Sequence, residues 1–263
     1  MRLLEKEIGM LTPIMVLAML ALPNSSVGQE SLHAAIERGD LATLEALTGS
    51  GADLEVRDAE GFTPLLAAAY DREAAMVRSL VEAGSDVHAR VSGSGWTPLH
   101  AVAWGLAPTS DSDGLIGTVT ILLSADAAIE ARDGASMTSL HAAVQNSRNS
   151  ELVTALLAAG ADVDPRDDAG WTPLFYAAAV GKVDAIRVLV ASGADVGVRA
   201  TGVERGWTPL HQAANNGHET TVLELVETRA DVKVRSGAGT VALHVAARRG
   251  HAEIVAVLLT STV

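Results

Sequence analysis

A nine-residue segment recurs along this chain at nearly constant spacing. Its clearest copies begin at Gly61, Gly95, Gly170 and Gly206 and read Gly-aromatic-Thr-Pro-Leu, followed by a run rich in alanine. The threonine position falls at residues 63, 97, 138, 172, 208 and 241, which gives steps of 34, 41, 34, 36 and 33 residues. A period of this length is typical of a solenoid, in which each unit buries its faces only against its neighbours.

The local chemistry of each copy predicts two helices. Threonine followed by proline favours a helix start, because proline lacks an N–H that the first turn does not need. A second apolar stretch follows at helical spacing, for example residues 183–190, and ends near Gly193. Glycine takes a left-handed conformation easily at such an end, and we expect Asp126 and Arg229 to take it in two other repeats.

The combination of Thr-Pro-Leu-His-x-Ala-Ala with Gly-Ala-Asp, repeated about seven times over residues 31–263, resembles the ankyrin repeat family. The resemblance implies an all-α solenoid of about seven helix-turn-helix repeats with β-turn fingers. No second domain is expected. The mature domain, residues 29–263, divides at approximately 29–58, 59–92, 93–133, 134–167, 168–203, 204–236 and 237–263.

The two longer steps predict insertions. The step of 41 residues indicates a solvent loop at residues 105–114, between the two helices of the third repeat. The step of 36 residues indicates a longer turn at residues 200–206, between the fifth and sixth repeats.

Residues 1–28 differ in character from the rest of the chain. An uncharged run at residues 8–22 has the length of a signal-peptide apolar region and is shorter than the roughly 17–25 residues that span a bilayer. We predict cleavage after Gly28, a mature start at Gln29 and a periplasmic or secreted location. Two alternatives remain open, because Glu5 and Glu7 cancel the basic residues ahead of the run: an uncleaved membrane anchor, or a true start at Met10.

Charge and cysteine content exclude several classes of function. The 32 acidic and 19 basic residues give a net charge of −13, which repels phosphate backbones and anionic lipids. We therefore expect a basic or neutral protein partner, no nucleic acid, and no membrane contact beyond the signal segment. The absence of cysteine excludes disulfides, thiol catalysis and the usual zinc and iron–sulfur sites.

The histidines and acidic clusters invite a metal-site interpretation that we do not favour. One motif position holds histidine in five repeats, and the ankyrin resemblance implies structural hydrogen bonds there: His33, His100, His141, His211 and His244. These residues lie a repeat apart, too far to share one ion. The acidic runs at 111–114 and 162–168 lack the spacing of a calcium loop. No metal, cofactor or catalytic residue is predicted, and no hydrolase, phosphate-loop or zinc-protease motif occurs.

The aromatic residues carry the functional prediction. The chain has only eight, and six of them occupy two motif positions that face the concave surface in the ankyrin family. Large aromatic groups on one face favour partner contact, although the rings could instead stack on adjacent fingers. The predicted partner-binding residues are Phe62, Tyr70, Trp96, Trp104, Met137, Trp171 and Trp207.

We therefore predict a non-catalytic protein-interaction module that binds a partner on the concave face after export. The alternatives are a periplasmic small-molecule or metal-binding protein, or the same module held at a membrane by an uncleaved N-terminus. The last helix, within residues 251–263, has no polar capping repeat after it. End-to-end self-association and a tolerated apolar patch are both compatible with this feature.

Overall fold

The computed structural model describes residues 31–105, 112–146, 150–202 and 205–261. These residues contain fourteen helices and no strand, which confirms the predicted all-α class. The described helices belong to one compact unit, Leu32–Val263. The predicted signal segment, residues 1–28, lies outside the described residues.

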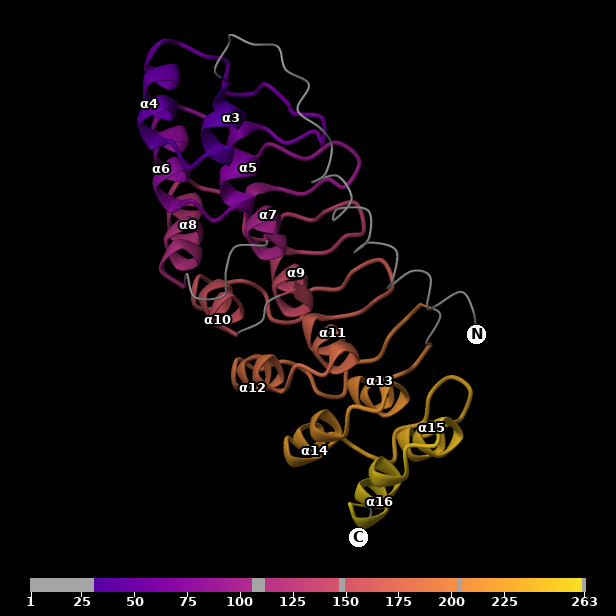
Figure 1. Cartoon of the computed structure of the whole chain (residues 1–263). Coiled ribbons are helices and arrows are strands. Elements are labelled where there is room, and N and C mark those ends of the chain that lie inside the picture. The colour runs from indigo at the N-terminus through magenta and orange to yellow at the C-terminus, as the bar shows by residue number, and fades with distance from the viewer. Residues whose placement is uncertain (1–30, 106–111, 147–149, 203–204, 262–263) are drawn as a thin grey trace. The chain divides into compact units, whose positions relative to one another are not determined.

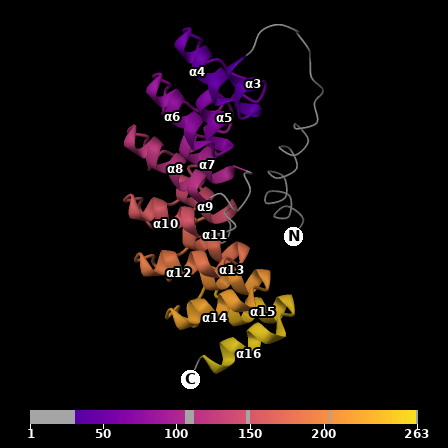
Figure 2. The same ribbon diagram turned by 60° about the vertical axis from the view of Figure 1, so that its left-hand side comes forward.

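The helices form seven consecutive pairs. Figures 1 and 2 show the odd-numbered, inner helices in one row and the even-numbered, outer helices in a second row, and successive helices of each row contact one another. This arrangement confirms the predicted solenoid of about seven units. The pairs are α3 (Leu32–Glu37) and α4 (Leu41–Gly49), α5 (Pro64–Tyr70) and α6 (Ala74–Glu82), α7 (Pro98–Trp104) and α8 (Ser112–Ser124), α9 (Ser139–Asn146) and α10 (Glu151–Ala158), α11 (Pro173–Val180) and α12 (Val183–Ala191), α13 (Pro209–Asn216) and α14 (Glu219–Glu227), and α15 (Ala242–Arg249) and α16 (Ala252–Thr260).

Threonines precede the inner helices as predicted at Thr63, Thr97, Thr172 and Thr208, whereas Val241 holds this position before α15. Thr63 has an extended backbone, and its hydroxyl oxygen accepts a hydrogen bond from the Leu66 N–H at 3.4 Å. At Thr97 the third residue of the helix is His100, whose Nδ1 lies 2.9 Å from the threonine hydroxyl. Proline occupies the first helical position in both cases, where its missing N–H leaves no bond unmade.

The outer helices end in left-handed backbone, also as predicted. Gly193 has φ 96°, and the two non-glycine residues at this position, Asp126 and Arg229, have φ 69° and 71°. An L side chain costs free energy in this conformation, so these two helix ends are held by the packing around them.

The predicted loop at residues 105–114 is wrong at its C-terminal end. Helix α8 begins at Ser112, so its first turn takes in three residues that the composition assigned to the loop. Serine and aspartate favour the first turn of a helix as well as loops, and composition alone does not separate the two. Residues 106–111 lie outside the described residues.

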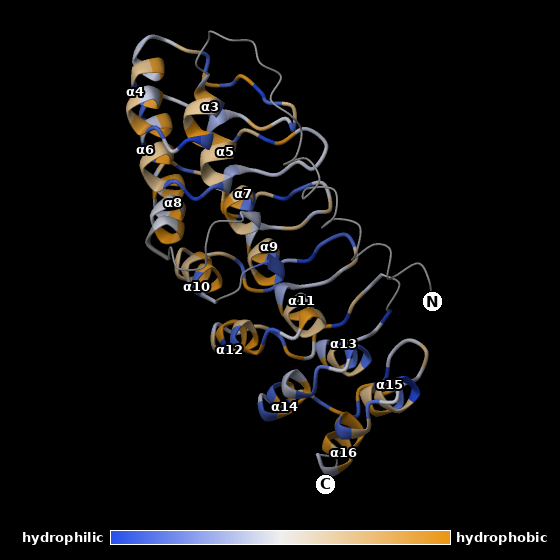
Figure 3. Cartoon of the chain, in the orientation of Figure 1, coloured by the Kyte–Doolittle hydropathy of each residue, from blue (hydrophilic) through white to orange (hydrophobic). Residues whose placement is uncertain are grey.

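Small residues and one leucine per unit build the core. Ala68 and Ala69 of α5 are fully buried, and so are Ala213 and Ala214 of α13, which lets successive inner helices approach closely. Figure 3 shows the apolar colour concentrated on the paired helices. In the second to sixth units, each outer helix buries a leucine four positions before its left-handed end residue: Leu80, Leu122, Leu156, Leu189 and Leu225.

Candidate functional site

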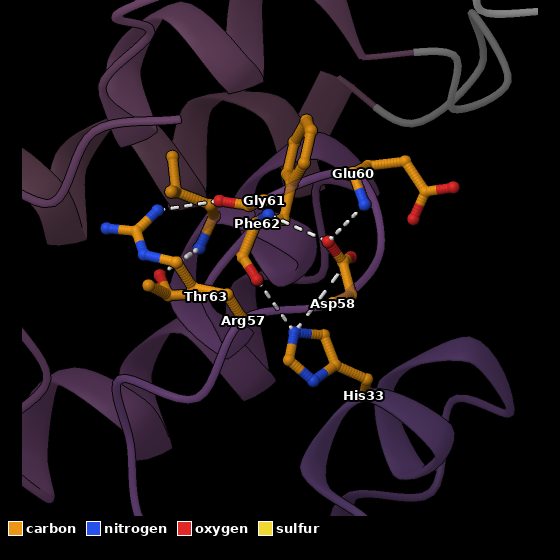
Figure 4. A network of polar contacts seen from close by, with 8 residues as sticks. His33, Arg57, Asp58, Glu60, Gly61, Phe62 and Thr63 are labelled. Atoms are coloured by element: carbon orange, nitrogen blue, oxygen red, sulfur yellow. Dashed lines mark hydrogen bonds and ion pairs between the residues drawn. The ribbon is translucent and has the colours of Figure 1, made fainter. Parts of the chain in front are cut away.

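Each finger is held by side chains that bond its own backbone. In the finger before α5, the Asp58 carboxylate accepts hydrogen bonds from the N–H groups of Glu60 at 3.0 Å and Phe62 at 2.8 Å (Figure 4). His33, from the previous unit, donates from Nε2 to the Phe62 carbonyl at 3.0 Å. The finger is therefore tied to both its own turn and the preceding inner helix.

The histidine position makes this bond in three further units. Nε2 of His100, His141 and His211 donates to the carbonyls of Met137, Trp171 and Thr240 at 2.9, 3.1 and 3.0 Å. Burial lowers the pKa of all three imidazoles, and their neutral form lets Nδ1 accept from the helix start while Nε2 donates. The predicted structural role is confirmed for these residues.

His244 differs from the other histidines. It is exposed, and its Nδ1 accepts a 3.5 Å hydrogen bond from the Val241 N–H. No described finger follows it to accept a bond from Nε2.

Arginines form a second inter-repeat contact that the sequence analysis missed. Arg57 donates from Nη1 to the Gly61 carbonyl of its own finger at 2.7 Å and to the Arg90 carbonyl of the next unit at 2.8 Å. Four more arginines donate to the backbone carbonyl of the next unit's arginine: Arg90, Arg132, Arg166 and Arg199. The recurrence of arginine at one position of the period is the sequence signal for this contact.

The predicted partner-binding residues fall into two groups by exposure. Phe62, Met137 and Trp171 are buried, with 7%, 8% and 7% of their surface exposed. These three side chains therefore add little exposed surface to the face on which partner contact is predicted. The other four are half-buried: Tyr70, Trp96, Trp104 and Trp207.

Two aromatic pairs join the finger position to the end of the inner helix. Phe62 packs edge-on against Tyr70 with ring centroids 5.9 Å apart. Trp96 stacks on Trp104 with centroids 5.6 Å apart and an interplanar angle of 8°. The structure thus brings together four of the predicted residues in two adjacent units.

The remaining predicted residues lie in a second cluster around α11. Trp171 packs against Phe175 and Tyr176 with centroids 4.6 and 5.0 Å apart, and Trp207 lies against the same cluster. The Tyr176 hydroxyl donates to the Asp167 carboxylate at 2.6 Å and lies 4.0 Å from the Met137 sulfur. The sequence analysis did not single out Phe175 and Tyr176, which bury the ring of Trp171.

The ends of the inner helices form a continuous row. Asn146 donates from its amide to the carbonyl of Trp104 at 2.9 Å, and Asn216 donates to the carbonyl of Ala179 at 2.7 Å. Each bond reaches from one unit to the previous one, so neighbouring helix ends lie side by side. We call this set the inner-helix row: Glu37, Tyr70, Asp71, Trp104, Asn146, Val180, Asn216, Arg248 and Arg249.

Within the described ranges, no group of three or more His, Asp or Glu side chains is arranged to hold a metal ion. No helix of those ranges is both long enough and apolar enough to cross a membrane.

Known proteins with ankyrin repeats share this architecture. A family model described as ankyrin repeats (3 copies) matches residues 32–109, 110–200 and 198–263. The crystal structure of the human ASB11 ankyrin repeat domain is similar, with a TM-score of 0.72 and 25% identity, covering 89% of this chain and 98% of that one. The ankyrin repeat domain of Bcl-3, described as a unique member of the IkappaB protein family, gives a TM-score of 0.69 and 29% identity, covering 86% of this chain and 98% of that one.

Proposed function

Because this chain belongs to the ankyrin repeat family, we propose that it is a non-catalytic module that binds a partner protein on the face carrying its fingers and inner-helix row. Ankyrin repeats are generally protein–protein interaction modules, and both similar solved structures are ankyrin repeat domains. The resemblance predicts that this face is concave.

The observation that carries the proposal is the stacked pair of Trp96 and Trp104. Both indoles keep part of their surface in solvent, and each holds the other in a fixed orientation. A large aromatic ring that is already immobile loses little entropy when a partner covers it, so such residues dominate binding energy at many interfaces. Tyr70 and Trp207 extend the same kind of surface along the solenoid.

The buried residues of the predicted set take a supporting role in this proposal. Phe62 packs edge-on against Tyr70, and Trp171 packs against Tyr176. Their substitution would change binding by moving the exposed rings as well as by removing contact area.

The net charge of −13 favours a basic or neutral partner. Complementary charge raises the rate of association at low ionic strength and has a smaller effect on the final affinity.

The test is a titration of the captured partner against matched variants of the full chain. A partner cross-linked to the wild-type chain is identified, produced separately and titrated by calorimetry against Trp96→Ala/Trp207→Ala. The control is Leu223→Ala, which removes an apolar group that is 39% exposed on the outer helix α14. We expect a loss of about tenfold or more in affinity for the double variant and less than about twofold for the control.

Circular dichroism and thermal melting establish that each variant is folded before titration. A folded double variant that binds with wild-type affinity would show that the aromatic face is not the binding site.

We further propose that the chain is exported and loses residues 1–28. The support is the sequence pattern alone: a short uncharged run followed by the small residues Ser26 and Gly28. Mass spectrometry of the protein recovered from cells should find Gln29 as its first residue. Recovery of an intact N-terminus in the membrane fraction would instead support the tethered alternative.

A further inference from the structure

The charge along the inner-helix row changes sign from the first unit to the last. The row begins with two exposed carboxylates, Glu37 at the end of α3 and Asp71 just after α5. It ends with two exposed guanidinium groups, Arg248 and Arg249, in the last turn of α15. The members of the row between them are uncharged: Trp104, Asn146, Val180 and Asn216.

The acidic end is not neutralised by its neighbours. Partial desolvation raises the pKa of Asp71, and the negative charges of Glu73 and then Glu37 raise it further, so the three carboxylates share one region. None of the ion pairs within the described residues involves any of the three.

Two arginines, Arg38 and Arg72, lie near the acidic end. The Arg72 guanidinium donates to the Val102 carbonyl at 3.2 Å. Arg38 lies close to Asp40, whose pKa is lowered first by hydrogen bonds from Thr43 and then by the Arg38 charge. The four carboxylates of this region, Glu37, Asp40, Asp71 and Glu73, outnumber these two guanidinium groups, so the region around Asp71 keeps a net negative charge.

The basic end is equally available. Arg249 is exposed, and its Nε donates to the Asn215 side-chain carbonyl at 2.8 Å. Neither Arg248 nor Arg249 takes part in an ion pair with another described residue. Two cations at a helix C-terminus also complement the helix dipole, and they keep their charge in doing so.

The two ends are far enough apart to act separately. Five steps between neighbouring inner helices separate α5 from α15, and packed helices lie roughly 8–10 Å apart, which gives about 45 Å. The Debye length at physiological salt is about 8 Å, so salt screens the charges at one end from those at the other. An extended polypeptide advances about 3.3 Å per residue and would need roughly 14 residues to connect them.

We propose that the partner supplies an extended segment that lies along the inner-helix row in one orientation only, with basic residues over Glu37 and Asp71 and acidic residues over Arg248 and Arg249. This inference rests on the proposed binding function and adds the partner's charge pattern and direction. The uncharged middle of the segment covers the half-exposed rings, of which Trp104 is the largest in the row. Reversing the segment would place like charges together at both ends.

The test uses two synthetic peptides of identical composition. The block peptide carries lysines at one end, glutamates at the other and a Gly-Ser-Leu spacer of about 14 residues between them. The control peptide distributes the same lysines and glutamates alternately along its length. A nitroxide placed at either end of the block peptide broadens the amide resonances of the isotope-labelled full chain that lie near it.

The expected result is polarised broadening. A label on the lysine end affects α3 and α5, a label on the glutamate end affects α15, and the block peptide binds at least about fivefold more tightly than the alternating one at low salt. In Arg248→Glu/Arg249→Glu the glutamate-end label loses its effect on α15, while the lysine-end label still acts on α5. Equal broadening at both ends, or equal affinity of the two peptides, overturns the proposal.

Binding of the natural partner to two variants tests this inference separately from the proposed function on which it rests. Loss of the partner in Trp96→Ala/Trp207→Ala with full retention in Arg248→Glu/Arg249→Glu would uphold the binding face and refute the charge polarity. Retention in the aromatic variant would refute the binding face itself. A purified chain that is dimeric, and that Arg248→Glu/Arg249→Glu makes monomeric, would show that a second copy occupies the row.

Discussion

The buried imidazoles connect one helix start to the next finger, and their role depends on a neutral ring. Nδ1 of His100 accepts from the Thr97 N–H while Nε2 donates to Met137, and a protonated ring could not accept at Nδ1. Leu66 and Phe175 stand at the same position in two units, where the threonine oxygen alone bonds the helix N–H. The solenoid therefore tolerates loss of this bond at single units.

These histidines make stability depend on pH. Their folded-state pKa values lie below the ordinary value of 6.5, so the unfolded chain takes up protons that the folded chain resists. The free energy of unfolding should be constant above about pH 7.5 and fall as the pH drops below 6.5. Thermal melting of the wild type between about pH 8 and 5.5 measures this slope.

The variant His141→Leu should melt with a shallower pH slope than the wild type, since one titrating group is gone. His244→Leu is the matched control, because it makes the same substitution at the same motif position in an exposed side chain. Identical slopes for all three proteins would contradict the assignment of the pH dependence to the buried rings.

The arginine contacts predict a stability loss at an exposed residue. Arg132 donates to the carbonyls of Ser136 and Arg166, in its own finger and in the next unit. Arg132→Ala should lower the free energy of unfolding by about 1–2 kcal/mol in a denaturant titration. Arg78→Ala should change it by less than about 0.5 kcal/mol, since Arg78 is exposed on α6 without such bonds among the described residues. An equal effect of the two substitutions would show that the arginine hydrogen bonds do not contribute to the free energy of unfolding.

At the scale of the helix, two glycines end inner helices for different reasons. Gly105 follows α7 with φ −54°, a value open to any residue, but a Cβ there would overlap the Tyr70 carbonyl of the previous unit. Gly250 follows α15 with φ 81°, and a Cβ there would meet nothing within 4 Å. Gly105 is required because neighbouring units approach closely there, and Gly250 is required because its backbone is left-handed.

Alanine substitution separates these two causes. Gly250→Ala should cost about 1 kcal/mol, the strain of a left-handed L residue. Gly105→Ala should cost about 2–3 kcal/mol or more, because backbone must move to accept the methyl group. Denaturant unfolding of both variants measures the difference, and a Gly105→Ala cost no larger than that of Gly250→Ala would contradict the close approach of α7 to α5.

The helix scale also explains why exposure of the finger rings could not be read from the sequence. Trp96 and Trp171 occupy the same motif position, yet the first is half-buried and the second is 93% buried, since only 7% of its surface is exposed. Phe175 and Tyr176 follow Trp171 and cover it, whereas the equivalent residues after Trp96 are His100 and Ala101. Motif position predicts the face, and the neighbouring side chains decide how much of each ring remains in solvent.

At the scale of the whole molecule, the repeat period of the sequence predicted most of the fold. Repetition of one segment predicted the paired helices, the threonine starts and the left-handed ends, because each unit can bury its faces only against the next. Arginine recurs at one position of the period, but the sequence does not show that each guanidinium bonds the backbone of the next unit. The start of α8 at Ser112 was missed because serine and aspartate suit both a loop and a helix start.

The central claim is that a partner covers the fingers and the inner-helix row, and oxidative footprinting tests it directly. Hydroxyl radicals label Tyr70, Trp96 and Trp207 of the chain alone, since each keeps part of its ring in solvent. Addition of the identified partner should lower the labelling of all three rings and leave exposed Leu223 on α14 unchanged. Protection confined to α14 and the other outer helices, with the three rings labelled as in the free chain, would contradict the account.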